Sequence, residues 1–180
     1  MKVKGLLIAA LSALMVLSGA ATAHAMGSGN PYENVQVGVT YTVYQPTFTA
    51  GLRQQHVGPN QWCQKGTEQN LMATFGKRSQ RGFTIWEGNP MCADIGNGRT
   101  VLTTTINGAT ATVVAYCDPA SPKPCRQSDV IKYGGHLSVM LPGVNGLRST
   151  QVWIETYSAK NLSAQQLVQI ARGLQPTGAR

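Results

Sequence analysis

The chain has 180 residues with 15 basic and 7 acidic side chains, which gives a formal net charge of +8 at pH 7. This length is enough for one domain with a substantial core, and it excludes two domains of ordinary size. The excess of basic residues favours attraction to anionic partners.

The first 25 residues have the layout of a secretory signal peptide. Lys2 and Lys4 precede an apolar run, and Ala23 and Ala25 occupy the small-residue positions of a cleavage site. We expect cleavage after Ala25 and a mature protein that is secreted or extracytoplasmic, with 13 basic against 7 acidic residues and a formal net charge of +6. An uncleaved anchor is the alternative, because the run approaches the ~20 residues that span a bilayer.

The mature chain is predicted to be a flexible lead over 26–34, a single α+β domain over 35–176 and a tail over 177–180. Apolar residues alternate with polar ones over 35–43, which predicts a strand that Pro46 ends. The stretch 49–66 has no periodicity, and we expect it to be a long loop. A short strand is predicted over 82–88, between two glycines.

The strongest local signal is Asn107-Gly108 between two β-rich runs. This pair supplies the two positive-φ residues of a type I′ turn, so the segment predicts a β-hairpin. Two further strands are predicted, one within 134–143 and one within 149–157, because apolar residues alternate in both.

The last long element is an amphipathic helix that begins at Ser163 and stops at Pro176. Ser163 and Gln166 form a capping box, and the apolar stripe suits docking on a sheet. The predicted fold class is therefore α+β: a curved antiparallel β-sheet of about six to eight strands, covered by one C-terminal helix.

Four cysteines remain in the mature chain, at positions 63, 92, 117 and 125. An even number in an exported chain predicts disulfides, and three pairings are open. We favour Cys63–Cys92 and Cys117–Cys125, two structural bridges, the second of which closes a proline-rich loop. Metal binding would need C-x-x-C spacing or nearby histidines, so neither a metal nor another cofactor is expected.

Groups suited to catalysis are sparse in the mature chain. His56 and His136 are its histidines, and Glu87 with Asp94 is the pair of carboxylates closest to converging near Cys92. We expect structural roles for these groups, and no G-x-S-x-G turn is present to hold a nucleophile. No catalytic residue is predicted.

Binding has more candidates than catalysis. The sequence GKRSQRG gathers three basic residues at an expected hairpin tip. Lys123 lies between two prolines in the Cys117–Cys125 loop, and the long loop carries His56 and Trp62. The candidate binding residues are Lys77, Arg78, Arg81, Lys123, His56 and Trp62. The expected partner is an anionic envelope polymer, a lipid or a protein. Specific nucleic-acid binding is not expected, and membrane contact is expected only through the uncleaved signal peptide.

The end of the chain resembles one known class of domain. The strand VWIET and the helix NLSAQQLVQIARGL resemble the closing strand and helix of extracytoplasmic sensor domains of anti-sigma-factor type, which are similar to lipoprotein carriers. The matching positions are Leu162, Ser163, Leu167, Ile170, Ala171 and Leu174. The resemblance implies a curved sheet with helices on its concave side and a non-catalytic domain that binds or senses outside the membrane. It transfers no functional residue.

Three functions follow as hypotheses. The first is a secreted, non-catalytic binding or sensing domain. The second is a protease-inhibitor-like protein that presents the 117–125 loop with Lys123 as its contact residue, because a rigid loop loses little entropy on binding. The third is an envelope hydrolase, which would require a cleft that joins His56 with Glu87 or Asp94. A separation of more than about 10 Å between these side chains, well beyond hydrogen-bond reach, would exclude it.

Overall fold

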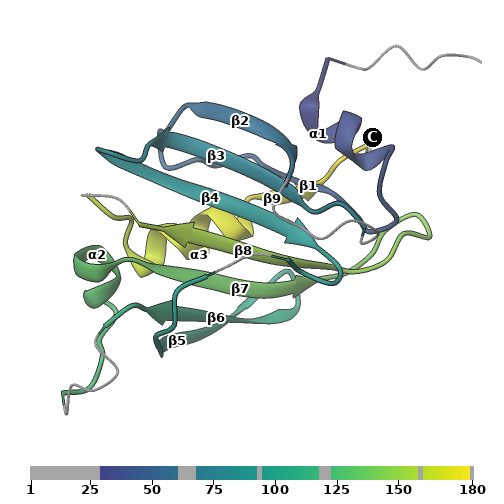
Figure 1. Cartoon of the computed structure of the whole chain (residues 1–180). Helices are drawn as coiled ribbons and strands as arrows, with labels where there is room; N and C mark the ends of the chain where they lie inside the picture. The colour runs from purple at the N-terminus through teal and green to yellow at the C-terminus, as the bar shows by residue number, and fades with distance from the viewer. Residues whose placement is uncertain (1–28, 61–67, 93–94, 118–122, 158–159, 179–180) are drawn as a thin grey trace, which may run out of the picture.

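The computed structural model describes residues 29–60, 68–92, 95–117, 123–157 and 160–178. The predicted signal peptide, Trp62, Cys63 and Asp94 lie outside these residues. In chain order the elements are α1 (Pro31–Gln36), β1 (Tyr44–Pro46), β2 (Gln54–Pro59), β3 (Leu71–Lys77), β4 (Arg81–Gly88), β5 (Arg99–Ile106), β6 (Ala109–Ala115), α2 (Asp129–Tyr133), β7 (Gly135–Leu141), β8 (Thr150–Thr156), α3 (Ala164–Arg172) and β9 (Leu174–Pro176) (Figure 1).

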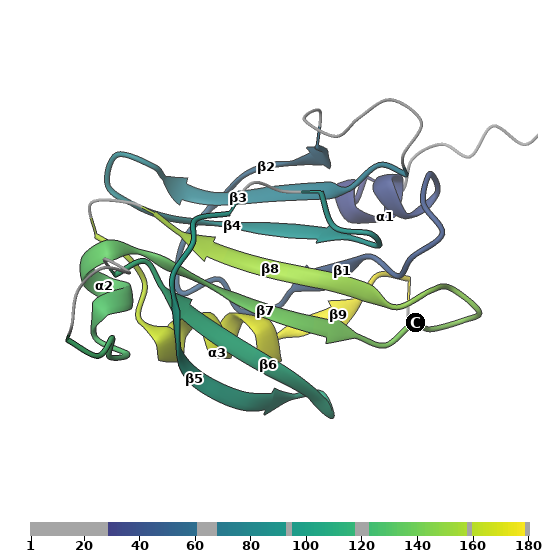
Figure 2. The same cartoon turned by 60° about the horizontal axis from the view of Figure 1, so that its bottom comes forward.

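Seven strands form one antiparallel sheet in the order β2-β3-β4-β8-β7-β6-β5, which confirms the predicted antiparallel architecture. The strands β1 and β9 pair separately in a small antiparallel sheet. After β4 the chain crosses to the far edge, builds β5, β6 and β7 inward, and then places β8 between β7 and β4 (Figures 1 and 2). The two parts of the sheet are therefore joined by β8.

The hairpin predicted from Asn107-Gly108 is formed by β5 and β6. Asn107 has φ 49° and Gly108 has φ 82°, the left-handed values that a type I′ turn requires. The pairing of Ile106 with Ala109 encloses these two residues directly, so the turn sets the register of the hairpin as far as the shift between Thr100 and Leu102.

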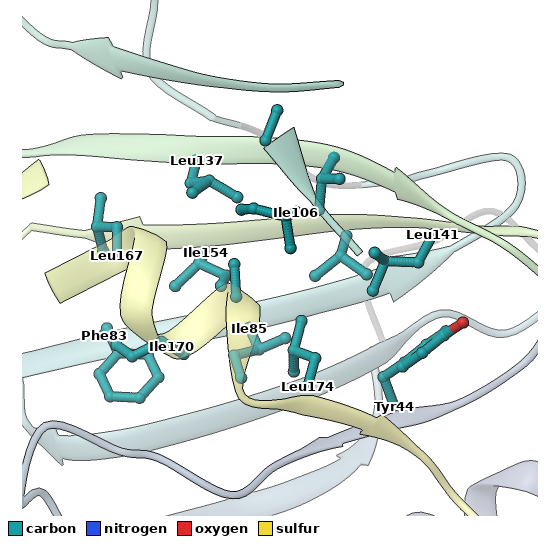
Figure 3. Packing of buried hydrophobic residues seen from close by; sticks show 14 of the residues in the cluster. Tyr44, Phe83, Ile85, Ile106, Leu137, Leu141, Ile154, Leu167, Ile170 and Leu174 are labelled. Atoms are coloured by element: carbon teal, nitrogen blue, oxygen red, sulfur yellow. The ribbon is translucent and has the colours of Figure 1, made fainter. Parts of the chain in front are cut away.

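The core lies between one face of the sheet and α3. Alternate residues of β7 and β8 are buried on this face, among them Leu137 and Ile154. Leu167 and Ile170 of α3 point at them, as Figure 3 shows. Burial of one such side chain stabilises the fold by ~1.5–3 kcal/mol. We call the face opposite α3 the outer face of the sheet.

The expected capping box at the start of α3 is present. The Oγ atom of Ser163 accepts a hydrogen bond from the Gln166 N–H at 3.2 Å, and Oε1 of Gln166 accepts one from the Ser163 N–H at 3.0 Å. The helix ends earlier than predicted, at Arg172, and the chain passes through Gly173 into β9. A Cβ atom at Gly173 would lie 3.2 Å from the backbone nitrogen of Phe48, so glycine permits a close approach of the two segments. Residues 174–176 therefore extend the small sheet instead of the helix.

The strand predicted over 35–43 is wrong. Residues 31–36, which include part of the predicted flexible lead, form α1, where the Asn30 side chain accepts from the Tyr32 N–H at 3.0 Å. Pro31 supplies a φ that suits the first helical position. After the helix, Val39, Tyr41 and Val43 are buried on an extended segment, but Thr42 is buried as well, so burial does not follow the alternation of the sequence.

The long loop predicted over 49–66 is also wrong in part, because residues 54–59 form the edge strand β2. The side chains of β2 are mostly exposed, because the strand lies at the edge of the sheet and pairs with β3 alone. Its sequence therefore lacks the alternation of apolar residues by which a strand is predicted. The short helix α2 was not predicted. The Cys117–Cys125 disulfide is formed as predicted, whereas Cys63–Cys92 stays a prediction because Cys63 lies outside the described residues.

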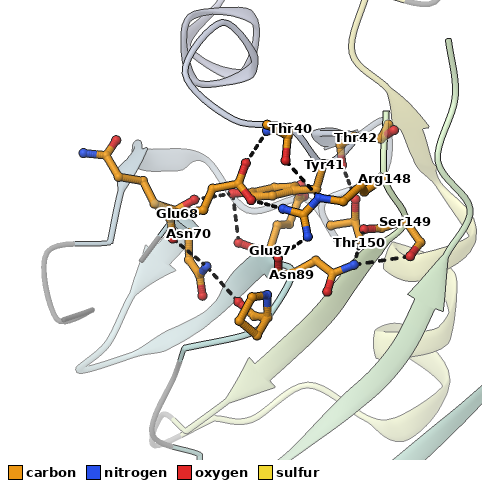
Figure 4. Close-up of polar contacts among 12 residues, drawn as sticks. Thr40, Tyr41, Thr42, Glu68, Asn70, Glu87, Asn89, Arg148, Ser149 and Thr150 are labelled. Carbon is orange, nitrogen blue, oxygen red and sulfur yellow. Dashed lines mark hydrogen bonds and ion pairs between the residues drawn. The ribbon is translucent and has the colours of Figure 1, made fainter. Parts of the chain in front are cut away.

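The extended segment before β1 is fastened to the start of β8 by polar contacts (Figure 4). Arg148 forms an ion pair with Glu68 and donates to the carbonyl of Asn89 at 2.8 Å and to Oγ1 of Thr40 at 2.9 Å. The backbone N–H of Thr42 donates to the carbonyl of Arg148 at 3.0 Å. Arg148 thus belongs to the framework of the fold.

Candidate functional site

One end of the seven-stranded sheet collects basic side chains. At this end β3 and β8 stop, whereas β2, β4 and β7 begin. Basic residues lie at these strand ends, beside them and in α2. We call this group the basic end, and its members are Arg53, Lys77, Arg78, Arg81, Lys132 and Lys160.

Two hydrogen bonds place distant parts of the chain against the β3–β4 hairpin. The Gly76 N–H donates to the carbonyl of Arg53 at 2.9 Å, and the Lys160 N–H donates to the carbonyl of Gln80 at 2.9 Å. Residues 53 and 160 therefore lie beside a hairpin tip that already carries Lys77, Arg78 and Arg81. The sequence cluster of three is a larger cluster in space.

Few acidic groups oppose these cations among the described residues. Glu155 is near the end of β8 but is buried, and Asp129 in α2 accepts a hydrogen bond from the Arg126 N–H at 2.7 Å. At the opposite end of the sheet, Arg148 is paired with Glu68. Six cations therefore lie at the basic end, and Glu155 and Asp129 are the acidic groups described near them.

A pocket of about 320 Å³ opens beside the β3–β4 hairpin tip. It has both apolar and polar walls, and its lining residues are Met72, Thr74, Phe75, Gly76, Arg78, Gly82, Phe83, Thr84 and Tyr157. The φ of Gly76 is +71°, and a Cβ atom there would lie 2.2 Å from the carbonyl oxygen of Arg81. Glycine at this position thus lets the two strands approach closely at the tip.

The side chain of Arg78 is held over an aromatic ring at the pocket. Its Cζ atom lies 4.7 Å from the centroid of the Tyr157 ring, and the Tyr157 hydroxyl lies 2.6 Å from Oγ1 of Thr84. Stacking on a ring restrains a guanidinium group while its N–H donors, which lie in the plane of the guanidinium group itself, stay available. The arrangement suits recognition of a carboxylate or phosphate group.

A second polar cluster lies on the outer face, closer to the middle of the sheet. The Tyr116 hydroxyl donates to Oε1 of Glu155 at 2.7 Å, and Nδ1 of His136 lies 3.3 Å from the same hydroxyl. Burial lowers the pKa of His136 to about 4. Gly96, on the connection from β4 to β5, lies against the Tyr116 ring. The cluster of Tyr116, Glu155 and neutral His136 therefore links the end of β6, β7, β8 and the connection from β4 to β5. We interpret this as a structural role.

The hydrolase hypothesis required His56 and Glu87 to lie close together, and the structure places them on opposite faces of the sheet. His56 pairs with Thr74, which pairs with Thr84, so the register places His56 on the outer face. Glu87 is three residues after Thr84 and therefore points to the opposite face, where it is fully buried. The sheet lies between the two side chains. The other carboxylate of that hypothesis, Asp94, is outside the described residues.

The remaining predicted residues fall into two groups. Lys123 is exposed on the connection between β6 and α2, close in sequence to the Cys117–Cys125 disulfide. Trp62 is outside the described residues. The sequence did not indicate Arg53, Lys160 or Tyr157, because their contribution depends on which strands neighbour one another, and no local pattern reports that.

Comparison with protein-family models, with curated proteins and with solved structures finds no match for this chain. The site is therefore interpreted from its own chemistry. Within the described residues, no helix has both the length and the apolar character needed to cross a membrane.

Proposed function

We propose that this protein is a non-catalytic binding or sensing domain that acts at the cell envelope or outside the cell, and that it recognises an anionic partner through the basic end. The observation that carries the proposal is the gathering of cations at one end of the sheet. The cations of the β3–β4 tip lie beside residues 53 and 160, and at the other end Arg148 forms an ion pair with Glu68.

Neighbouring cations are needed for such recognition, because a single exposed charge contributes little in salt. The Debye length is about 8 Å at physiological ionic strength, so only charges close together act jointly on one partner. The backbone contacts bring the segments that carry residues 53 and 160 against the β3–β4 tip, where Lys77 pairs with Arg81 across the hairpin. Arg78, restrained by Tyr157, is the group best placed to bind one anion directly.

Two features of the sequence support a place outside the cytoplasm. The N-terminal 25 residues fit a signal peptide, and the last strand and helix resemble extracytoplasmic sensor domains. The Cys117–Cys125 disulfide agrees with an oxidising compartment. Export and the family resemblance remain parts of the proposal.

The test is retention of the chain from Met26 onward on immobilised polyuronate and on immobilised polyphosphate, eluted with NaCl. We expect retention at about 0.15 M NaCl, where isolated surface charges are largely screened. The variant Arg78→Gln should elute at lower salt, and the triple variant Lys77→Gln/Arg78→Gln/Arg81→Gln should lose retention.

The matched control is Arg172→Gln, because it removes one exposed positive charge at the end of α3, away from the β3–β4 tip. Its elution should change little. If Arg172→Gln shifts elution as much as Arg78→Gln does, only net charge matters and the proposed site is wrong. Absence of retention by the unmodified chain on both polymers would end the proposal.

A protease-inhibitor-like function is the second candidate, favoured by one observation. Lys123 is exposed and lies two residues before Cys125, whose disulfide with Cys117 is formed. A disulfide-closed loop loses little conformational entropy on binding. Inhibition of a trypsin-like protease that disappears in Lys123→Ala would support it. Absence of inhibition at micromolar protein would exclude it.

A further inference from the structure

The short helix α2 presents large apolar side chains to solvent. Val130 is fully buried against the domain, but Ile131 is 52% exposed and Tyr133 is 47% exposed. Lys132 lies between them, with its Nζ atom 4.7 Å from the centroid of the Tyr133 ring. Val130 is the residue of this helix that belongs to the core, whereas about half of the surface of Ile131 and of Tyr133 faces solvent.

A continuous chain of contacts joins α2 to the hairpin tip of the basic end. The Asn161 side chain donates through Nδ2 to the carbonyl of Ile131 at 3.2 Å, and the preceding residue, Lys160, donates its N–H to the carbonyl of Gln80. Both views of the molecule place α2 at the same end of the sheet as the β3–β4 tip (Figures 1 and 2). Apolar and basic side chains therefore occupy one continuous end of the molecule.

We propose that this end docks on an anionic lipid bilayer, with the cations of the basic end at the headgroups and with Ile131 and Tyr133 inserted at the interface. The proposal rests on the proposed function and names the class of the anionic partner. It adds a membrane contact of the folded domain to the contact expected through the signal peptide alone.

A bilayer fits this surface better than a soluble polyanion does. A polyanion would use the cations and leave Ile131 and Tyr133 exposed to water. The bilayer interface offers a negative surface potential together with a region that accepts apolar and aromatic side chains. Lysine and arginine side chains beside an inserted apolar residue are the combination that peripheral membrane proteins use.

Other exposed apolar residues lie away from this surface and serve as controls. Met140 is 47% exposed on β7, where it pairs with Gln151 near the start of β8, at the opposite end of the sheet. Val37 follows α1 and is 83% exposed. Neither adjoins the hairpin tip, so their replacement should not affect docking.

The test is co-sedimentation of the chain from Met26 onward with vesicles of phosphatidylcholine containing 30% phosphatidylglycerol, and with vesicles of phosphatidylcholine alone. We expect binding to the anionic vesicles that weakens at high salt. The variant Ile131→Ser/Tyr133→Ser should weaken partitioning roughly tenfold while its elution from immobilised polyuronate stays unchanged. The control Val37→Ser/Met140→Ser should bind vesicles like the unmodified chain. Circular dichroism of each variant checks that the fold is kept.

The outcomes separate this proposal from the proposed function. Polymer retention without vesicle binding would overturn the membrane proposal and keep the anionic site. Vesicle binding that Ile131→Ser/Tyr133→Ser leaves intact would also overturn it, since the cations alone would then suffice. Failure on both polymer and vesicles would overturn the two proposals together.

Discussion

The Oε2 atom of Glu87 accepts a hydrogen bond from the backbone N–H of Tyr44 at 2.9 Å, and this bond ties strand β4 of the large sheet to strand β1 of the small one. Glu87 is fully buried, and its Oε1 atom has no hydrogen-bond partner among the described residues. A carboxyl in this position is more stable with a proton than without one.

The first prediction concerns pH. Burial raises the pKa of Glu87 to about 8, although the bond from Tyr44 acts to lower it. The folded state thus keeps a proton that the unfolded chain releases above its ordinary pKa of 4.5. Stability should be fully present below that value and fall as pH rises towards 8, by at most about 1.4 kcal/mol per pH unit for one proton.

Urea unfolding between pH 7 and 8.5 measures this effect. The contribution of His136, whose pKa burial lowers to about 4, has the opposite sign and fades above its ordinary pKa of 6.5. The variant Glu87→Gln should flatten the profile and be more stable than the unmodified chain at pH 8. A flat profile for the unmodified chain would contradict the prediction.

The second prediction concerns the cap of α3. Replacement Ser163→Ala removes the acceptor of the Gln166 N–H and should lower the free energy of unfolding by ~1 kcal/mol. Chemical denaturation measures the loss. Gln165→Ala, next to the cap on an exposed position, is the control and should change stability by no more than a few tenths of a kcal/mol.

The third prediction concerns the disulfide. Cys117 and Cys125 are 8 residues apart, so their bridge closes a small loop. The double variant Cys117→Ser/Cys125→Ser should lower the free energy of unfolding by about 2.5 kcal/mol, mainly because the unfolded chain gains freedom. Denaturation with and without reductant checks it: reductant should destabilise the double variant less than the unmodified chain.

The fourth prediction concerns the pocket. The Tyr157 ring restrains Arg78, and an exposed cation–π contact contributes ~0.5–1 kcal/mol. Tyr157→Ala should therefore weaken polyuronate binding about two- to fivefold. Tyr157→Phe keeps the ring and loses only the hydroxyl beside Thr84, so its binding should stay close to that of the unmodified chain. If both variants lost the same amount of polyuronate binding, the hydroxyl group and not the ring would be responsible for the contribution of Tyr157.

Features whose cause lies within a few residues could be predicted from the sequence. Asn107-Gly108 specifies its own turn, and Ser163 with Gln166 specifies its own cap. The segment 35–43 misled the prediction because alternation alone does not distinguish a sheet strand from an extended segment with buried side chains. The signal for α1 was present in Asn30 and Pro31, a cap followed by a proline at the first helical position.

The basic end could be predicted only in part. Lys77, Arg78 and Arg81 are neighbours in sequence, so the hairpin alone collects them. Arg53 and Lys160 join them because β2 pairs with β3 and because β8 pairs with β4. Strand order is decided by the packing of the whole sheet, and one sequence does not report it. The Glu68–Arg148 pair was missed for the same reason.

The small sheet brings early and late parts of the chain together. Gln45 pairs with Gln175, the Thr177 N–H donates to the carbonyl of Val43 at 2.8 Å, and Asn30 donates to Gln45 at 2.9 Å. A short linker could therefore join residue 178 to residue 29, and the backbone could be opened instead at Ala50-Gly51, a turn between β1 and β2 that lies outside both sheets. Such a circular permutant should keep the sheet and the basic end, because the fold depends on which strands meet and not on where translation starts.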